Sequence, residues 1–344
     1  GCPARACFAK RHHQTGPHPR YGRTMAGTLL ILGPQRPSAN LAGALAGVGV
    51  TGTVALITAG WRHDEPDVAH LGGDLGRSLE GGPGCETVHL PLYRWFDECM
   101  DAAPDLRAAW RAQRDRVLAF KDLYRVRLAA DHGVVQQLIA RPVRDAEVHA
   151  SELLDASRAL RDLDARVPAQ LDAYRAFAGI AATPWTHPVV APRHAQIASI
   201  LAGCSAVAIA GGHAAVLLNR LRFFGLGDLL PAMLSRGGTV AAWSAGAMAL
   251  TDRVVLFYDD PPEGPSEPEV LDRGLGLLPE VVLFPHARRR LRLEQPDRLR
   301  QLHARFGTCL GLENGALVEV RDGGFQDRGV PGSLLRLTPA ERGT

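Results

Sequence analysis

The stretch GTVAAWSAGAMAL, residues 238–250, places Ser244 between two kinds of secondary structure. The apolar run before the serine predicts a buried strand, and residues 247–250 predict the start of a helix. Small residues flank the serine, which is typical of a nucleophile elbow, a tight turn that lifts the hydroxyl clear of the sheet. Ala242 departs from that pattern, because an elbow usually has glycine there. The alternative is a strand-to-helix turn whose serine is incidental.

Strands and helices alternate on both sides of this stretch. Short apolar runs predict strands at residues 28–33, 52–59, 86–92, 206–210, 254–258, 277–284 and 309–312. Helical patterns fall at residues 39–46, 195–201, 214–223, 229–234 and, with a break near Pro296, 287–305. Ser38 is expected to cap the first of these helices, and a hairpin is expected around Gly323-Gly324. This order predicts an α/β fold, a mostly parallel sheet flanked by helices.

Residues 93–179 interrupt the alternation with two apolar stripes at helical spacing, separated by Arg141-Pro142. They predict a long helical insertion, an antiparallel hairpin, within an α/β domain formed by residues 25–92 and 180–344. Its charges have mixed signs, which indicates a solvated face and not a basic patch. We expect the hairpin beside the mouth of the active site, as a lid or a dimer element; a partner-binding arm is the alternative.

Composition excludes several classes of function. The formal net charge of the 344 residues is +3, which gives no argument for binding nucleic acid. Residues 1–24 lack periodicity and are expected to be a disordered extension or a translation artefact. No run approaches the ~18 apolar residues of a membrane span, and the scattered cysteines suit a reducing cytoplasm. The Cys and His spacing matches no zinc pattern, so no metal and no cofactor are expected.

Candidate catalytic groups follow the predicted strands. Because the carboxyl ends of parallel strands meet at one edge, groups that follow them are expected to lie together. A serine nucleophile needs a base, and the base needs an acid to orient it. His286 is the candidate base because it ends an apolar strand. Glu313 is the candidate acid, with Asp259 and Asp260 as rivals.

Backbone N–H groups near the serine are candidates for the oxyanion hole. Ala245 supplies one by its position after Ser244. The pair Gly211-Gly212 follows the preceding strand, and glycine lets the backbone approach a substrate closely. The alternative for the pair is a plain strand-to-helix turn.

An arginine-rich helix follows His286. Residues three or four apart share a helical face, so Arg289 or Arg290 is expected to face the site with His286. A guanidinium there would bind a substrate carboxylate in a bidentate geometry. The alternative is that these arginines form a solvated face.

Five motifs occur in order: Ala210-Gly211-Gly212, Trp243-Ser244-Ala245-Gly246-Ala247, Gly274-Leu275-Gly276-Leu277-Leu278-Pro279, Pro285-His286 and Gly311-Leu312-Glu313-Asn314-Gly315-Ala316-Leu317. Together they resemble the dipeptidase E and cyanophycinase family of serine peptidases, loosely over residues 28–92 and well over 192–320. The resemblance implies a class I glutamine amidotransferase-like fold and a triad of Ser244, His286 and Glu313. It also implies an oxyanion hole at Gly212 and Ala245, with Gly211 and His213 near the substrate. His213 and Ala214 depart from the family pattern, which argues against cyanophycin as the substrate.

The sequence therefore predicts a serine hydrolase, specifically a peptidase. It is expected to cleave short peptides with an acidic residue at the cleaved bond, through an acyl-enzyme. The expected partner is a small peptide substrate, with neither nucleic acid nor membrane, and a homodimer is left open. One alternative is an α/β-hydrolase-type esterase, whose acid precedes its histidine, although few strands follow Ser244. Another is an inactive binding or scaffold protein of the same fold.

Overall fold

The computed structural model describes residues 26–71, 84–177, 179–257, 268–291 and 293–338. The predicted extension at residues 1–24 lies outside these residues, as do the rival acids Asp259 and Asp260.

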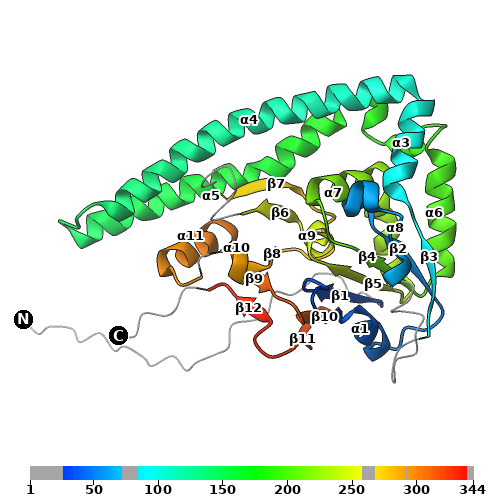
Figure 1. The fold of residues 1–344 in the computed structure, drawn as a ribbon. Coiled ribbons are helices and arrows are strands. Elements are labelled where there is room, and N and C mark those ends of the chain that lie inside the picture. Colours follow the sequence, from blue (N-terminus) through cyan, green and yellow to red (C-terminus); the bar gives the residue numbers. More distant parts are fainter. Residues whose placement is uncertain (1–25, 72–83, 178, 258–267, 292, 339–344) are drawn as a thin grey trace, which may run out of the picture.

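A seven-stranded sheet forms the centre of the fold (Figure 1). In spatial order its strands are β11 (Gly324–Asp327), β10 (Leu317–Arg321), β1 (Thr28–Leu32), β5 (Thr239–Trp243), β4 (Ala206–Ile209), β2 (Thr53–Ile57) and β3 (Glu86–His89). The five strands from β1 to β3 are parallel, whereas β10 and β11 form the predicted antiparallel hairpin at one edge. The predicted α/β architecture with a mostly parallel sheet is confirmed.

Two apolar cores cover the faces of this sheet. Successive side chains of a strand point to opposite faces, so Leu29 and Ile31 enter one core and Leu30 and Leu32 the other. The first core includes side chains of α6 (Ala191–Gly203), α7 (Ala214–Phe223), α8 (Leu226–Ser235) and α9 (Ala245–Leu250). The second includes α1 (Leu41–Gly47). All five parallel strands therefore end at the same edge, beyond which the loops collect.

The start of α1 differs from the prediction. Its N-terminal cap is Asn40 and not Ser38, and the Asn40 side chain makes no capping hydrogen bond to the helix. Instead Gln35 Oε1 accepts from the backbone N–H groups of Asn40 and Leu41, at 2.9 and 3.0 Å. The long Gln35 side chain reaches back to the helix from the preceding loop, which a search for short capping residues does not detect.

Two smaller sheets carry the rest of the strands. β8 (Val281–Pro285) and β9 (Thr308–Leu312) are parallel, and β12 (Leu334–Arg336) is antiparallel to β9. The helices α10 (Ala287–Arg290) and α11 (Pro296–Phe306) connect β8 to β9, so a crossover does join His286 to Glu313. β6 (Arg253–Leu256) and β7 (Glu269–Arg273) form an antiparallel ribbon. Among the described residues, the strands after Ser244 that join the seven-stranded sheet, β10 and β11, are antiparallel to their neighbours. No further parallel strand in this part of the chain follows the serine in this sheet, which argues against the α/β-hydrolase alternative.

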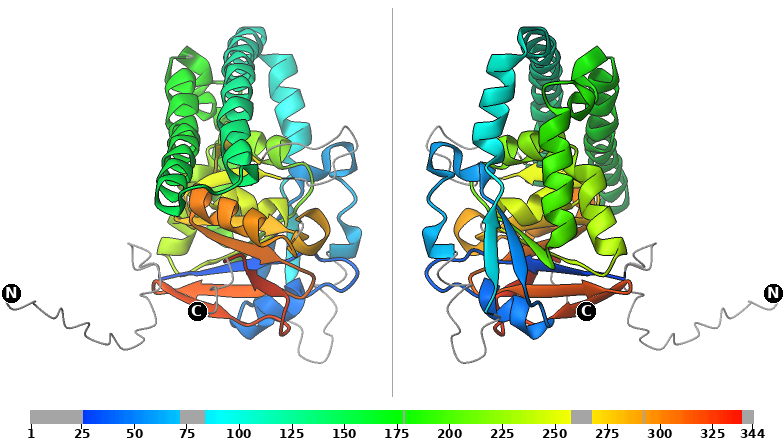
Figure 2. Two further views of the ribbon diagram at one scale, coloured as in Figure 1. Left: turned by 90° about the vertical axis from the view of Figure 1, so that its left-hand side faces the viewer. Right: turned by 90° about the vertical axis from the view of Figure 1, so that its right-hand side faces the viewer.

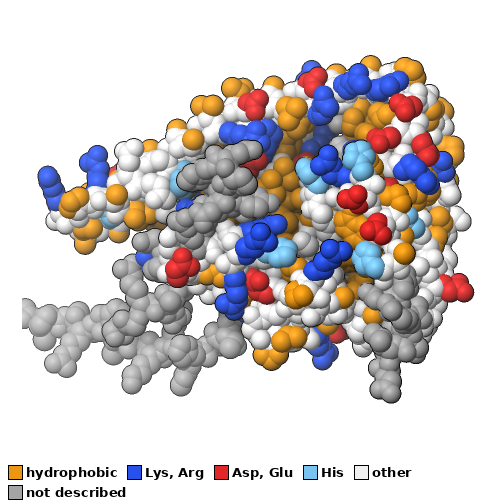
Figure 3. Space-filling view, viewed as in Figure 1, with side chains coloured by type: hydrophobic (Ala, Val, Ile, Leu, Met, Phe, Trp, Pro, Cys, Tyr) orange, Lys and Arg blue, Asp and Glu red, His pale blue; other side chains and the backbone are white. Residues whose placement is uncertain are grey.

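The insertion is helical as predicted. α3 (Leu92–Ala102) precedes α4 (Pro104–Ala140) and α5 (Ala146–Ala176), which form an antiparallel hairpin. α5 continues through Pro168. Figure 2 shows the hairpin on one side of the molecule, away from β1 and β10, and α5 packs on β7 and α11. Side chains of mixed type lie along it in Figure 3, in agreement with a solvated outer face.

Short 3-10 helices complete the described chain: η1 (Ala59–Asp64), η2 (Gly179–Ala181) and η3 (Pro184–Thr186). The four cysteines within the described residues are buried free thiols: Cys85, Cys99, Cys204 and Cys309. None of the helices in the described part of the chain combines the length and apolar character that a membrane span requires.

Candidate active site

Ser244 occupies a strained turn between β5 and α9. Its backbone has φ 53° and ψ −122°, a conformation that non-glycine residues rarely adopt. Gly246 allows this turn, because a Cβ there would lie 2.4 Å from the carbonyl oxygen of Ile209 at the end of β4. Ala242 is fully buried beneath the turn, so a methyl group fits where an elbow usually has glycine. The local geometry is that of the predicted nucleophile elbow.

The pair Gly211-Gly212 lies directly against the serine. A Cβ on Gly211 would be 2.7 Å from the Cβ of Ser244 and 3.2 Å from its Oγ. Gly212 has φ 108°, and a Cβ on it would be 2.4 Å from the carbonyl oxygen of Gly60. Within the described residues the N–H groups of Gly212 and Ala245 donate no backbone hydrogen bond. Gly211 and Gly212 therefore need glycine for close approach. Among the described residues, the N–H groups of Gly212 and Ala245 stay without a backbone acceptor near Ser244.

His286 follows β8 in the left-handed conformation, with φ 57° and ψ 42°. Its N–H donates to the carbonyl oxygen of Leu312, at 2.9 Å, which places it beside the end of β9. Glu313 directly follows the last residue of β9, and its Oε1 accepts from the N–H of Arg288 at 2.7 Å. Gly311 has no side chain, which allows α10 to lie close to β9. A Cβ on Gly311 would be 2.6 Å from the Cβ of Ala287. The crossover thus brings the candidate base and acid to adjacent strand ends.

Burial is the largest influence on the pKa of His286 and lowers it. The positive charge of Arg290 lowers this pKa further, Glu313 opposes the shift, and Arg289 adds a smaller lowering effect. In the described structure no hydrogen bond joins His286 to Ser244 or to Glu313. Such contacts are often long in unliganded enzymes and shorten when substrate binds.

One cavity of about 770 Å³ contains both Ser244 and His286. It lies beyond the carboxyl ends of the parallel strands, where ligands of open α/β sheets bind. Gly211, Gly212 and Trp243 line it, together with the loops at residues 34–39 and 61–71. Side chains of both charges and several histidines gather below the hairpin in Figure 3.

Four charged or titratable residues in this cavity were not among the predicted site residues: Arg36, Asp64, Asp67 and His70. They follow the ends of β1 and β2. The strand-end rule that selects Gly212 and His286 could have found these loops. It could not have shown which of their side chains point inward.

The other predicted substrate residues lie elsewhere. Arg289 is exposed and does not line the cavity, whereas Arg290 lines a separate small cavity beside Met248 and Phe284. His213 caps α7, where its Nδ1 accepts from the N–H of Val216 at 3.3 Å. The structure thus brings Ser244, His286 and the glycine pair together and leaves these three side chains outside the cavity lining.

The hairpin is not where it was expected. Of the described residues, none from α4 or α5 lines the cavity that holds Ser244. The hairpin packs on β7 and α11 instead. Its apolar stripes and several buried polar side chains make their contacts with these two elements. One of these is Asp164, which pairs with Arg305 at 2.8 Å. The prediction of a hairpin at the mouth of the site is wrong in this respect.

Within the described ranges, no group of three or more His, Cys, Asp or Glu side chains could hold a metal ion.

A scan of protein families matches residues 171–327 to Peptidase family S51. This part of the chain is therefore similar to family S51. The matched S51 segment contains Ser244, His286, Glu313 and the glycine pair, and excludes α4 and the loops after β1 and β2. The S51 match supports a serine peptidase.

Two solved structures align with most of the chain. One is a peptidase from an acI-B1 Actinobacterium, with a TM-score of 0.47 and 15% sequence identity, covering 92% of this chain and 96% of that one. The other is a putative peptidase E protein from Listeria monocytogenes EGD-e, with a TM-score of 0.39 and 10% identity, covering 88% of this chain and 98% of that one. No curated protein matches the sequence.

Proposed function

We propose that this protein is a serine peptidase that cleaves short peptides through an acyl-enzyme on Ser244. The observation that carries the proposal is the position of Ser244: a strained strand-to-helix turn, facing Gly211, in the cavity that also holds His286. A nucleophile, a neighbouring base and free backbone donors are the parts that acyl transfer needs.

In the proposed mechanism His286 takes the proton of the Ser244 hydroxyl as Oγ attacks the peptide carbonyl carbon. The N–H groups of Gly212 and Ala245 donate to the oxyanion of the tetrahedral intermediate. His286 then gives its proton to the leaving amine, and the C–N bond breaks. A water molecule, deprotonated by His286, hydrolyses the acyl ester and restores Ser244.

Glu313 is the proposed third member of the triad. Its carboxylate is fixed by the N–H of Arg288 at 2.7 Å and acts electrostatically on His286, whose pKa it raises against the lowering by burial. A carboxylate in this position holds the imidazole in one orientation and stabilises the imidazolium that forms. The rival acids Asp259 and Asp260 lie outside the described residues. The role of Glu313 as the acid is therefore tested by comparing the activities of Glu313→Gln and Asp260→Asn.

The cavity suits a small zwitterionic peptide. Its volume is in the range of sites for small ligands, and Arg36 offers a guanidinium for an acidic side chain. Asp64 and Asp67 offer carboxylates for the free amino group of the peptide. We propose Arg36 as the residue that selects an acidic side chain, with Arg289 and Arg290 as the alternative.

Covalent labelling tests the nucleophile. A fluorophosphonate probe should add once to the intact protein, as measured by mass spectrometry, and should not add to Ser244→Ala. Equal labelling of both proteins would refute the acyl-enzyme. No labelling of either would favour the inactive scaffold protein.

A panel of dipeptides with N-terminal Asp, Glu, Asn, Leu and Arg tests the specificity. The Asp and Glu peptides should be hydrolysed fastest, and Arg36→Gln should remove that preference while leaving the Leu peptide unaffected. Arg289→Gln and Arg290→Gln serve as matched controls, since each removes one arginine outside the cavity lining. If a control variant lost the preference and Arg36→Gln kept it, the arginine-rich helix, and not Arg36, would select the acidic side chain.

A further inference from the structure

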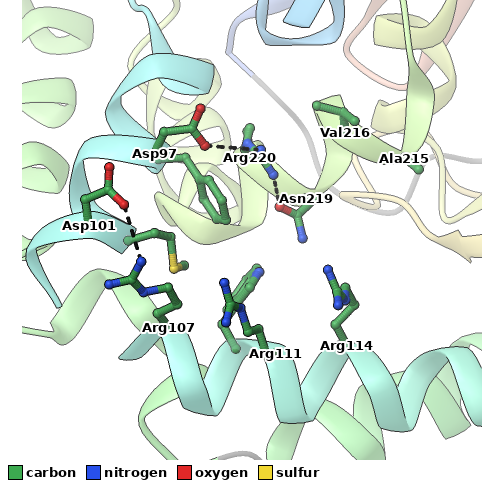
Figure 4. Close-up of a pocket in the computed structure, with 12 residues that line it drawn as sticks. Asp97, Asp101, Arg107, Arg111, Arg114, Ala215, Val216, Asn219 and Arg220 are labelled. Atoms are coloured by element: carbon green, nitrogen blue, oxygen red, sulfur yellow. Dashed lines mark hydrogen bonds and ion pairs between the residues drawn. The ribbon is translucent and has the colours of Figure 1, made fainter. Parts of the chain in front are cut away.

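A second cleft, of about 620 Å³, lies between α3, α4 and α7 (Figure 4). Arg107, Arg111 and Arg114 of α4 line it at spacings of four and three residues, which places all three on one helical face. Figure 4 shows Arg111 and Arg114 extending from α4 toward Asn219 of α7. In the described chain, no residue lines both this cleft and the cavity that holds Ser244.

Positive charge exceeds negative charge in the cleft, where Asp97 and Asp101 face four arginines. Asp101 pairs with Arg107 at 3.4 Å. The structure records no ion pair for Arg111 among the described residues, and Arg114 pairs only with its exposed sequence neighbour Asp115, at 3.3 Å. Two guanidiniums therefore lie at the cleft without a carboxylate from across it.

The wall formed by α7 adds donors. Arg220 is mostly buried, and its nearest carboxylate, that of Asp97, is 4.0 Å away. Arg220 Nη1 donates to Asn219 Oδ1 at 2.6 Å, and among the described residues no hydrogen bond is recorded for the Asn219 amide nitrogen. In Figure 4 this nitrogen points across the cleft toward α4. Donors from two helices thus converge on one space.

An apolar surface lies beside these donors. Phe96, Met100 and Trp110 line the cleft, and the rings of Phe96 and Trp110 contact edge to face, with centroids 6.0 Å apart. A ligand with an apolar body could cover these side chains while its charged end meets the arginines. Bidentate arginines bind carboxylate and phosphate groups in preference to other anions.

We propose that this cleft is a binding site for a small organic dianion, one whose two negative charges, on a phosphate or on two carboxylates, are carried by an apolar body. Arg111, Arg114 and the Asn219 amide bind the charged group, and Trp110 and Phe96 contact the body. The site is additional to the peptidase site. It lies against the first turn of α7, through Ala215 and Val216, shortly after Gly211-Gly212.

Calorimetric titration with phenyl phosphate and with phthalate tests the proposal and distinguishes the two sources of charge. We expect one molecule to bind per chain, more weakly at high salt, and benzamide, which is uncharged, not to bind. The tighter of the two anions identifies the class of ligand. Absence of binding by both at millimolar concentration would overturn the proposal.

The double variant Arg111→Gln/Arg114→Gln should weaken binding about tenfold or more, because each guanidinium contributes charged hydrogen bonds. Asn219→Asp should weaken it as well, by placing a negative charge at the cleft. The matched control is Arg116→Gln/Arg127→Gln, which removes the same charge from exposed positions of α4 outside the cleft and should bind normally. Equal losses of affinity in the two double variants would show that the probes are attracted only by the net charge of the protein. Loss of binding in Arg36→Gln would place the probe in the Ser244 cavity; either result overturns the proposal.

Discussion

Single residues of the site adopt backbone conformations that side chains usually avoid. Ser244 and His286 both have positive φ, which costs about 1–3 kcal/mol for a non-glycine residue unless the surroundings enforce it. Backbone hydrogen bonds hold both residues in these conformations. Met248 N–H donates to Ser244 O at 3.1 Å, and His286 N–H donates to Leu312 O at 2.9 Å. The strain is therefore part of how the two side chains reach one cavity.

Gly211→Ala should inactivate the enzyme while the fold persists. The added methyl group would lie 2.7 Å from the Cβ of Ser244, so the serine must move, and misplacement by about 1 Å costs on the order of 10²-fold in rate. Steady-state hydrolysis of an Asp dipeptide, together with circular dichroism, measures this. Gly43→Ala in α1 is the matched control, because its methyl group meets nothing within 4 Å. Full activity of Gly211→Ala would show that Ser244 does not need its present position.

The pH profile should follow His286, which must be neutral to act as a base. Burial and Arg290 lower its pKa, so activity should persist below the ordinary titration range of histidine. Arg290→Gln should raise this pKa and move the acid limb of kcat/KM to higher pH. Glu313→Gln should move the limb to lower pH and reduce kcat on the order of 10²–10⁴-fold. Shifts of the same sign in both variants would contradict the assignment of His286 as the base. Full activity of Glu313→Gln with loss of activity in Asp260→Asn would indicate the α/β-hydrolase order, in which the acid precedes the histidine.

Among the elements, the hairpin is held by polar groups as well as by its apolar stripes. Asp164 of α5 accepts from Tyr124 Oη at 2.7 Å and from Arg305 Nε at 2.8 Å. The Tyr124 hydroxyl also accepts from the N–H of Val270, at 3.1 Å. One buried carboxylate therefore connects α4, α5, α11 and β7.

Asp164→Ala should destabilise the protein by about 3–5 kcal/mol, because the guanidinium of Arg305 would stay buried without its partner. The Arg305 and Asp164 side chains are only 2% and 0% exposed. Urea unfolding followed by circular dichroism measures the change. Asp162→Ala, two residues earlier on the exposed face of α5, should change the stability little. A comparable loss in both variants would mean that the helix, and not the buried pair, is responsible.

Across the whole molecule, the hairpin and the Ser244 cavity are separate features. α4 and α5 lie over β7 and α11, while the cavity is lined by loops after the parallel strands. The α4–α7 side of the molecule carries the arginine-lined cleft instead. Among the described residues, the insertion therefore carries a separate cleft, and neither α4 nor α5 contributes a side chain to the lining of the Ser244 cavity.

Limited trypsin digestion of the native protein tests the folded state of the hairpin. Within residues 93–179, the first cut should fall after Arg144, in the turn between α4 and α5, because packed helical bonds are protected from cleavage. Peptide masses over time identify the order of cuts. Cleavage throughout α4 and α5 at one rate would contradict a folded hairpin, and heat-unfolded protein provides the reference for that pattern.

Local patterns in the sequence determined most of the strands, though not β7 or β12, together with the helical insertion and the glycine- and alanine-flanked turn at Ser244. Apolar runs select strands, and tight turns require small residues, so neighbours in the chain contain this information. The same patterns placed Ser244 and His286 after strands of a parallel fold, which was enough to bring both to one cavity.

Only the tertiary structure decided the rest. Arg36, Asp64 and Asp67 enter the cavity from loops whose side-chain directions no periodicity fixes, while Arg289 and Arg290 lie outside its lining. The hairpin lies on β7 and α11 because of pairs distant in the chain, such as Asp164 with Arg305. Such pairs form only when the long elements pack together, so the position of the hairpin follows from contacts between remote residues and not from local sequence.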